Sequence, residues 1–307
     1  MEVIEVRPRG YCHGVVSALK KVRDVLADPS YPRPIYILGR VVHNAHVTRA
    51  LEKQGVIHLY DRNRTQLELI ESVPKGTVVF SAHGVSRRVI ERARSLGLTT
   101  VNAVCKDVDR VHDLIRKRLG DGDQVLYIGH KGHPETVAIL SIDSSIVLVE
   151  STKDALIRPQ RPTGKRIFVT NQTTLSLYDI EPILAVIRNR FENVVFDNEI
   201  CQATTMRQEA ITRIEADLLI VVGDPMSSNT NQLAAVGRRQ GIRSERIESL
   251  DELELAWLEG IDVVAVTSGA STPTRITREV IRFLRAYDKN DPSTWDNRSR
   301  LDLDRIV

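Results

Sequence analysis

The three cysteines of this 307-residue chain divide it into parts of nearly equal length. Cys12 and Cys105 are 93 residues apart, and Cys105 and Cys201 are 96 residues apart. A period of this length is that of a whole domain, since the units of solenoid proteins are only about 20 to 50 residues long. Chain length alone favours about two domains, whereas this spacing indicates three of similar construction.

Each third of the chain contains two short apolar runs, and each run leads directly into a stretch of small polar residues. Such runs are typical of buried parallel strands that end in loops. The two polar stretches of a third are 40 to 42 residues apart, and the first lies 28 to 31 residues after a cysteine. The six predicted strands begin at Ile35, Val78, Val125, Ile167, Leu218 and Val263.

Amphipathic helices are predicted between these strands. Their apolar residues recur at positions i, i+3, i+4 and i+7, as in residues 15–26. Further helices are predicted at residues 180–191, 207–214 and 277–286. Strands that alternate with helices indicate α/β domains with mostly parallel sheets.

The six polar stretches follow the carboxyl ends of the predicted strands, where open parallel sheets bind their ligands. Gly, Ser and Asn are common in loops because turns require them, but histidines and a carboxylate at matched positions need another explanation. We therefore predict one composite site at a pseudo-threefold axis. Its candidate residues are His43, His83, His133, Glu135, Thr173, Ser227, Ser228, Asn229 and Ser271.

The composition narrows the range of possible partners. The formal net charge is +3 with interleaved charges, and aromatic residues make up 5% of the chain, so neither nucleic-acid nor membrane-surface binding is predicted. No apolar run exceeds five residues, and the N-terminus lacks the features of a secretory signal. We expect a cytoplasmic protein.

The cysteines are candidate metal ligands. Their odd number, in a long chain without a secretory signal, argues against a disulfide framework. One thiolate from each third would form a metal site with an open coordination position. A zinc ion with three ligands fits this pattern, and so does an iron–sulfur cluster in which one iron lacks a cysteine. The spacing does not distinguish between the two, and three buried structural cysteines are the simplest alternative.

Eight short motifs lie at residues 10–14, 42–44, 81–86, 129–135, 171–176, 201–210, 222–231 and 269–271. They include Cys12 between two glycines, His133-Pro134-Glu135, and the Ser-Ser-Asn sequence that begins at Ser227. In order and spacing, these motifs closely resemble the 4-hydroxy-3-methylbut-2-enyl diphosphate reductase family of the non-mevalonate isoprenoid pathway. The resemblance covers residues 1–287.

This resemblance implies a trefoil of three α/β domains around one central [4Fe–4S] cluster. The domains would comprise residues 13–105, residues 106–200, and residues 1–12 together with 201–287, followed by a C-terminal tail at 288–307. Cys12, Cys105 and Cys201 would hold the cluster and leave its apical iron open.

The implied reaction removes the allylic hydroxyl of 4-hydroxy-3-methylbut-2-enyl diphosphate with two electrons and two protons. Its products would be isopentenyl and dimethylallyl diphosphates, and its electron donor would be a ferredoxin or a flavodoxin. His133, Glu135 and Thr173 would act near the hydroxyl. The substrate would be bound by His43, His83, His133, Thr173, Ser227, Ser228, Asn229 and Ser271.

Some positions differ from the family pattern. Lys106 follows the second cysteine where the family usually has proline, His13 stands where a small residue is common, and residues 136–140 also differ. Two alternatives therefore stay open at the level of sequence. One is a hydratase in which an open iron acts only as a Lewis acid, and the other is a non-catalytic iron–sulfur or zinc sensor.

Overall fold

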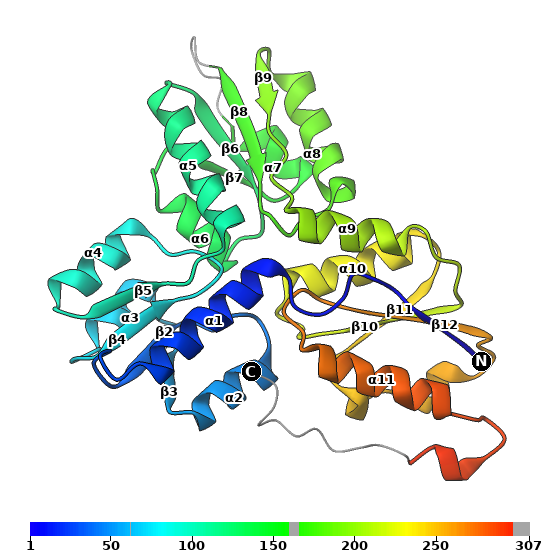
Figure 1. The fold of residues 1–307 in the computed structure, drawn as a ribbon. Coiled ribbons are helices and arrows are strands. Elements are labelled where there is room, and N and C mark those ends of the chain that lie inside the picture. Colours follow the sequence, from blue (N-terminus) through cyan, green and yellow to red (C-terminus); the bar gives the residue numbers. More distant parts are fainter. Residues whose placement is uncertain (62, 160–165, 297–307) are drawn as a thin grey trace. The chain divides into compact units, whose positions relative to one another are not determined.

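The computed structural model describes residues 1–61, 63–159 and 166–296 of the chain (Figure 1). These residues contain twelve strands, arranged as three parallel sheets of four strands each. The predicted class, three similar copies of an α/β fold with parallel sheets, is confirmed. Residues 297–307, which form most of the predicted C-terminal tail, lie outside the described residues.

The three sheets share one strand order. They are ordered β3-β2-β4-β5, β7-β6-β8-β9 and β11-β10-β12-β1. The strands are β1 (Glu2–Glu5), β2 (Ile35–Leu38), β3 (Val56–Leu59), β4 (Thr77–Phe80), β5 (Thr99–Asn102), β6 (Gln124–Ile128), β7 (Val147–Val149), β8 (Ile167–Asn171), β9 (Val194–Phe196), β10 (Leu218–Val222), β11 (Arg243–Ile247) and β12 (Val263–Ser268). The six strands that the sequence predicts are the two inner strands of each sheet.

The described chain forms two compact units. The terminal unit contains residues 1–16, 42–54 and the described part of 202–307, and it carries the sheet of β1, β10, β11 and β12. The middle unit contains residues 17–41 and 55–201, and it carries the other two sheets. The boundaries of three separate domains stay a prediction.

Helices connect most of the strands (Figure 1). They are α1 (His13–Ala27), α2 (Ala45–Lys53), α3 (Gln66–Glu71), α4 (Arg87–Ser95), α5 (Lys106–Gly120), α6 (Pro134–Leu140), α7 (Thr152–Ile157), α8 (Leu177–Arg190), α9 (Gln202–Ile211), α10 (Ser228–Arg239) and α11 (Thr274–Ala286). Within the described ranges, no helix is both long enough and apolar enough to span a membrane.

One predicted helix is displaced along the chain. The sequence pattern predicts residues 207–214, whereas α9 comprises Gln202–Ile211. The first turn of α9 is polar and gives no hydrophobic signal. Ile214 contributes to the pattern because it packs against the core of the terminal unit after the helix has ended. A partly buried apolar side chain beyond the end of the helix therefore extended the predicted helical pattern.

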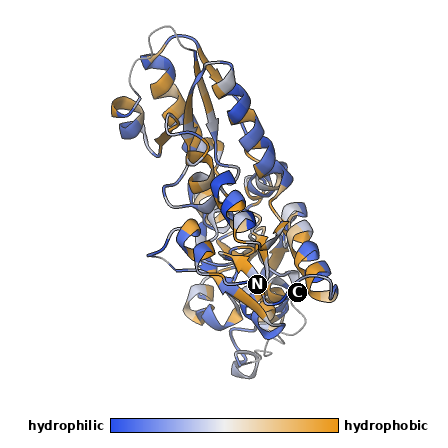
Figure 2. Cartoon of the chain, turned by 90° about the vertical axis from the view of Figure 1, so that its left-hand side faces the viewer, coloured by the Kyte–Doolittle hydropathy of each residue, from blue (hydrophilic) through white to orange (hydrophobic). Residues whose placement is uncertain are grey.

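The inner strands form the centre of the hydrophobic core in each unit. In β10 every residue is fully buried, and β2, β4 and β8 are buried along their whole length. Figure 2 shows the apolar colour concentrated on the strands, while the helices also carry polar residues. Parallel strands covered on both faces read as continuous apolar runs, which explains why the sequence predicts these strands.

Candidate functional site

The three cysteines occupy equivalent positions in the three sheets. Each cysteine follows an outer strand, which is β1 for Cys12, β5 for Cys105 and β9 for Cys201. These outer strands pair with the inner strands β12, β4 and β8, respectively. In each case the backbone N–H donates to a carbonyl in the loop after that inner strand. The three bonds are Cys12 N to Ala270 O (3.1 Å), Cys105 N to Ala82 O (3.0 Å) and Cys201 N to Thr173 O (3.0 Å). The repeat predicted from spacing is therefore present as a repeated hydrogen bond.

Each cysteine also lies at the start of a helix. α1, α5 and α9 begin at the residue after Cys12, Cys105 and Cys201, respectively. The partial positive charge of a helix N-terminus favours a negative group, which suits a thiolate. All three cysteines are partly exposed and none is in a disulfide. These soft anionic donors fit an iron–sulfur or zinc centre.

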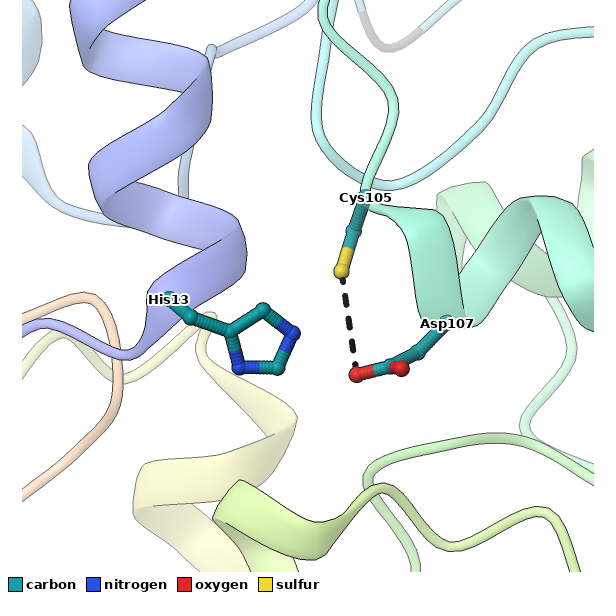
Figure 3. Close-up of side chains that lie close together, drawn as sticks. All are labelled: His13, Cys105 and Asp107. Atoms are coloured by element: carbon teal, nitrogen blue, oxygen red, sulfur yellow. Dashed lines mark hydrogen bonds between the residues drawn. The ribbon is translucent and has the colours of Figure 1, made fainter.

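A carboxylate lies close to the second cysteine. Cys105 Sγ is 4.0 Å from Oδ2 of Asp107, which stands in the first turn of α5 (Figure 3). Asp107 therefore adds negative charge beside one of the candidate ligands. The sequence analysis did not single out this residue, although its position two residues after a candidate ligand is a signal that could have been used.

A buried polar cluster of the middle unit is centred on Glu135. Its side chain is almost fully buried. Thr173 N donates to Oε1 at 2.8 Å and Thr173 Oγ1 donates to Oε2 at 2.8 Å. The hydroxyl of Tyr127 donates to Oε1 at 3.2 Å. Glu135 and Thr173, which were predicted to act together, are therefore brought into direct contact.

Burial raises the pKa of Glu135 to about 7, against the opposing effect of the hydrogen bonds from Thr173 and Tyr127. The nearby negative charge of Asp107 raises this pKa further. The upward direction expected for a carboxyl in a dry pocket is thus found, with desolvation as its main cause. A carboxyl group with such a pKa can both donate and accept a proton near neutral pH.

The local sequence explains how Glu135 is placed. His133 is the N-cap of α6 in an extended conformation, and Pro134 occupies the first helical position. Proline is favoured there because its missing N–H is not needed. Glu135, which was predicted in a polar loop, stands instead in the first turn of this helix.

Two of the predicted histidines are neighbours. The rings of His83 and His133 are in edge-to-face contact, with centroids 5.9 Å apart. Nδ1 of His133 accepts a hydrogen bond from Glu135 N at 3.3 Å. Neutral His133 therefore carries its proton on Nε2, because only one ring nitrogen of a neutral imidazole is protonated.

A second cluster lies in the terminal unit. Ser271 Oγ donates to the carbonyl oxygen of His43 at 2.8 Å and lies 3.5 Å from Ser227 Oγ. Ser227 is the N-cap of α10, and its hydroxyl accepts from Thr230 N. Ser228 opens this 12-residue helix. Hydroxyl donors at a helix N-terminus are suited to binding an anion.

Asn229 has a structural task in this cluster. Its side chain is buried, Oδ1 accepts from Ala270 N at 2.9 Å, and Nδ2 donates to Thr204 Oγ1 at 3.2 Å. Asn229 therefore fixes the loop that also receives the N–H of Cys12. The sequence predicted a polar loop at this point, whereas Asn229 belongs to the first turn of α10.

Two glycines, Gly223 in the loop after β10 and Gly269 in the loop after β12, allow these two loops to approach α10 closely. A Cβ atom on Gly269 would lie 2.0 Å from Thr230 Oγ1, and one on Gly223 would lie 2.5 Å from the same atom. Any larger residue at these positions would displace the helix start. The small residues that the sequence shows after β10 and β12 are therefore required by close packing as well as by turns.

The predicted site residues fall equally into the two units. The terminal unit holds Cys12, His43, Ser227, Ser228, Asn229 and Ser271, and the middle unit holds His83, Cys105, His133, Glu135, Thr173 and Cys201. Each group is assembled as described above. That both groups form one site stays a prediction.

A protein-family comparison matches residues 3–285 of the chain to the family described as LytB protein. This chain belongs to the LytB family. It is 48% identical to the 4-hydroxy-3-methylbut-2-enyl diphosphate reductase of Geobacillus sp. (strain WCH70), with 100% of this chain and 98% of that protein covered. The enzyme of the same name from Bacillus cytotoxicus is 47% identical, with the same coverage.

This LytB chain is also similar to solved structures of diphosphate reductases. The E-1-hydroxy-2-methyl-but-2-enyl-4-diphosphate reductase from Plasmodium falciparum has a TM-score of 0.86 and 29% identity, covering 95% of this chain and 89% of that one. A structure described as (E)-4-hydroxy-3-methyl-but-2-enyl diphosphate reductase, the terminal enzyme of the non-mevalonate pathway, has a TM-score of 0.64 and 26% identity, covering 94% of this chain and 100% of that one.

The LytB chain contains one further site residue that sequence reasoning missed. Tyr127 lies in the apolar strand β6 and is fully buried, yet its hydroxyl reaches Glu135. A tyrosine inside an inner strand needs a partner for its hydroxyl. That requirement is the signal that could have identified it.

Proposed function

We propose that this LytB chain is a 4-hydroxy-3-methylbut-2-enyl diphosphate reductase. The reaction breaks the allylic C–O bond, consumes two electrons and two protons, and releases the oxygen as water. Its organic products are isopentenyl and dimethylallyl diphosphates. The observation that carries the proposal is the buried Glu135–Thr173 pair, a proton-donating carboxyl with a pKa of about 7, in a chain whose full-length relatives bear this enzyme's name.

The family is one of [4Fe–4S] enzymes. In this chain Cys12, Cys105 and Cys201 would hold one cluster through their thiolates, which would leave one iron without a protein ligand. The equivalent positions of the three cysteines at helix N-termini support this assignment. When bound, such a cluster supplies electrons and a Lewis-acidic iron.

Glu135 is the proton source in this proposal. Its protonated carboxyl donates toward the departing oxygen, directly or through the hydroxyl of Thr173. Thr173 keeps the carboxyl oriented, because both its N–H and its hydroxyl are bonded to it. His133 presents Nε2–H and would bind the substrate next to this pair.

The diphosphate would be held mainly by neutral and cationic donors. Ser227 and Ser228 at the start of α10 supply hydroxyl and backbone N–H groups, and the helix N-terminus favours the anion. Asn229 shapes this loop and has a second amide N–H to offer. The hydroxyl of Ser271 would turn from the carbonyl of His43 to the diphosphate. His43 and His83 complete the set, since imidazolium groups form strong hydrogen bonds to phosphate oxygens.

The remaining assignments belong to the same proposal. The physiological electron donor is a ferredoxin or a flavodoxin, and the protein acts in the cytoplasm. The three domains have the boundaries predicted above. No observation on the described residues favours the hydratase or the sensor.

Metal analysis tests the cluster and excludes the alternatives. Protein purified without oxygen is assayed for iron, sulfide and zinc, and we expect about four irons and four sulfides per chain. Replacing Cys12, Cys105 or Cys201 by Ser one at a time should abolish a stable cluster and turnover. Zinc without sulfide would refute the cluster, and product formation without a reductant would indicate the hydratase.

A further inference from the structure

We propose that a pocket beside α11, in the terminal unit, binds a small molecule that carries a chain of two or more phosphate groups. The pocket has a volume of about 560 Å³, which lies within the range of about 300 to 1,000 Å³ that is usual for ligand sites. Charged side chains dominate its lining. These are Glu5, Arg7, Arg9, Arg278, Arg282 and Arg285.

Three of these arginines form a stripe on α11. Arg278, Arg282 and Arg285 are spaced at i, i+4 and i+7, and all three are exposed. Exposed helix faces are commonly stabilised by acidic residues one turn from basic ones, and like charges at this spacing repel. Within the described residues, Arg278 and Arg282 take part in no ion pair, and Arg282 acts only at longer range on Glu279 of the same helix. The stripe is therefore poorly explained by the stability of the helix.

Glu5 is the only carboxylate in the lining, and arginines already surround it. It is hydrogen-bonded by Arg9 and by Arg7 (3.3 Å), and Arg285 lies 2.8 Å from Oε1. The hydrogen bond from Arg9 is the main cause that lowers the pKa of Glu5, so this group is ionised near neutral pH. Five arginines and one glutamate leave a formal excess of four positive charges.

Arg9 lies at the buried base of the pocket and adds to its positive charge. Its side chain is only 10% exposed, yet Nε and Nη1 are buried and have no hydrogen-bond partner among the described residues. A buried charged donor without an acceptor is unfavourable. A phosphate group accepts two parallel hydrogen bonds from a guanidinium, and the exposed side chains of Arg278, Arg282 and Arg285 can offer such pairs of donors to a ligand in the pocket.

The charge of the pocket favours a small phosphorylated ligand over an acidic protein. A phosphate chain concentrates several negative charges in a short length, among the five arginines of the lining. Arginine also matches the geometry of phosphate better than lysine does. Ile281 and Ala286 add an apolar wall to the lining. Inorganic polyphosphate and a nucleoside triphosphate share the chemistry that this site would recognise.

Calorimetric titration of the cluster-loaded protein with inorganic tripolyphosphate and, separately, with ATP tests the proposal. The test variant is R278E/R282E, which reverses two exposed charges of the pocket. The matched control is R88E/R94E, which reverses two exposed arginines of α4 that do not line the pocket. We expect the test variant to weaken tripolyphosphate binding at least tenfold and the control to change it by less than twofold. Arg9→Lys should weaken binding less than the test variant, because it keeps the charge but loses the paired donors.

The ATP titration distinguishes the two ligand sources. Equal affinities show that the phosphate chain is recognised, and tighter ATP binding shows that the nucleoside contributes; both outcomes support the site. Binding that is lost in His43→Ala but kept in R278E/R282E would place the anion at the substrate site and overturn the proposal. No binding of either compound by the unmodified protein would also overturn the proposal. A higher KM of R278E/R282E for a reduced electron-carrier protein would then assign the arginines to an acidic protein. Cluster content and turnover of R278E/R282E with a chemical reductant should be unchanged, so failure here leaves the proposed function intact.

Discussion

Thr173 holds both oxygens of the Glu135 carboxyl, one through its backbone N–H and the other through its hydroxyl. The carboxyl is thereby fixed in orientation inside a buried environment that keeps its pKa near 7. Thr173 follows β8, and Glu135 lies in the first turn of α6, the helix that follows β6, so two neighbouring inner strands of one sheet place them together. The proposed proton delivery depends on this pair.

Glu135→Gln should bind the cluster and the substrate almost normally but lose roughly 10²-fold or more in turnover. The amide keeps the size of the side chain and can still accept from Thr173, whereas it cannot deliver the proton. Single-turnover rates with saturating reductant measure the effect. Thr173→Ala should lose less. A Glu135→Gln protein with the normal rate would assign proton delivery to His133 or water.

The same carboxyl should make stability depend on pH. Its pKa in the folded protein is about 7, above the value of 4.5 for a free glutamate. The contribution of this carboxyl to the free energy of unfolding is fully present at pH values below the pKa of the unfolded chain. It is lost as the pH rises through the pKa of the folded protein. Between pH 5 and pH 8 the unmodified protein should lose roughly 2 to 3 kcal/mol of stability relative to Glu135→Gln. Urea unfolding of both cluster-free proteins measures this difference, and parallel stability curves would contradict it.

Tyr127→Phe should shift the pH dependence of turnover. The hydrogen bond from Tyr127 lowers the pKa of Glu135, so its loss should raise that pKa further. The decline in kcat at high pH should then begin at a higher pH than in the unmodified protein. Stability should fall by about 1 kcal/mol, the usual effect of losing one buried hydrogen bond. An unchanged pH profile would show that Tyr127 has only a packing role.

Asn229→Ala should reduce stability and weaken substrate binding together. The change leaves the partly buried N–H of Ala270 without its acceptor, which costs about 1 kcal/mol. Asn231→Ala is the matched control, because Asn231 lies in the same helix but donates to Pro225 O at the surface. A rise in KM with normal stability would instead show that Asn229 only contacts the substrate.

The inner strands could be predicted from sequence, and the outer strands could not. β4 and β10 are buried throughout, so their composition carries a clear signal. By contrast, β5 is only partly buried and β11 has the sequence Arg-Ser-Glu-Arg-Ile. Outer strands are covered on fewer sides, and polar residues are tolerated there. Their pairing depends on contacts distant in sequence.

Residue types and their spacing predicted which side chains belong to the candidate site. They did not predict which residues those side chains contact. The raised pKa of Glu135 could be anticipated because a carboxyl in a dry pocket is disfavoured as a charge. Its contact with Tyr127 depends on how α6 packs on β6, which no local pattern encodes. The two hydrogen bonds of the Asn229 side chain could likewise not be predicted, because Ala270 and Thr204 lie far from it in the chain.

The ratio of electrons consumed to product formed tests the proposed function most directly. Under anaerobic conditions, a known amount of reduced electron carrier is mixed with the cluster-loaded protein and excess 4-hydroxy-3-methylbut-2-enyl diphosphate. Our account predicts two electrons oxidised for each molecule of isopentenyl or dimethylallyl diphosphate, with no product when the carrier is already oxidised. Conversion of the substrate without oxidation of the carrier would contradict it.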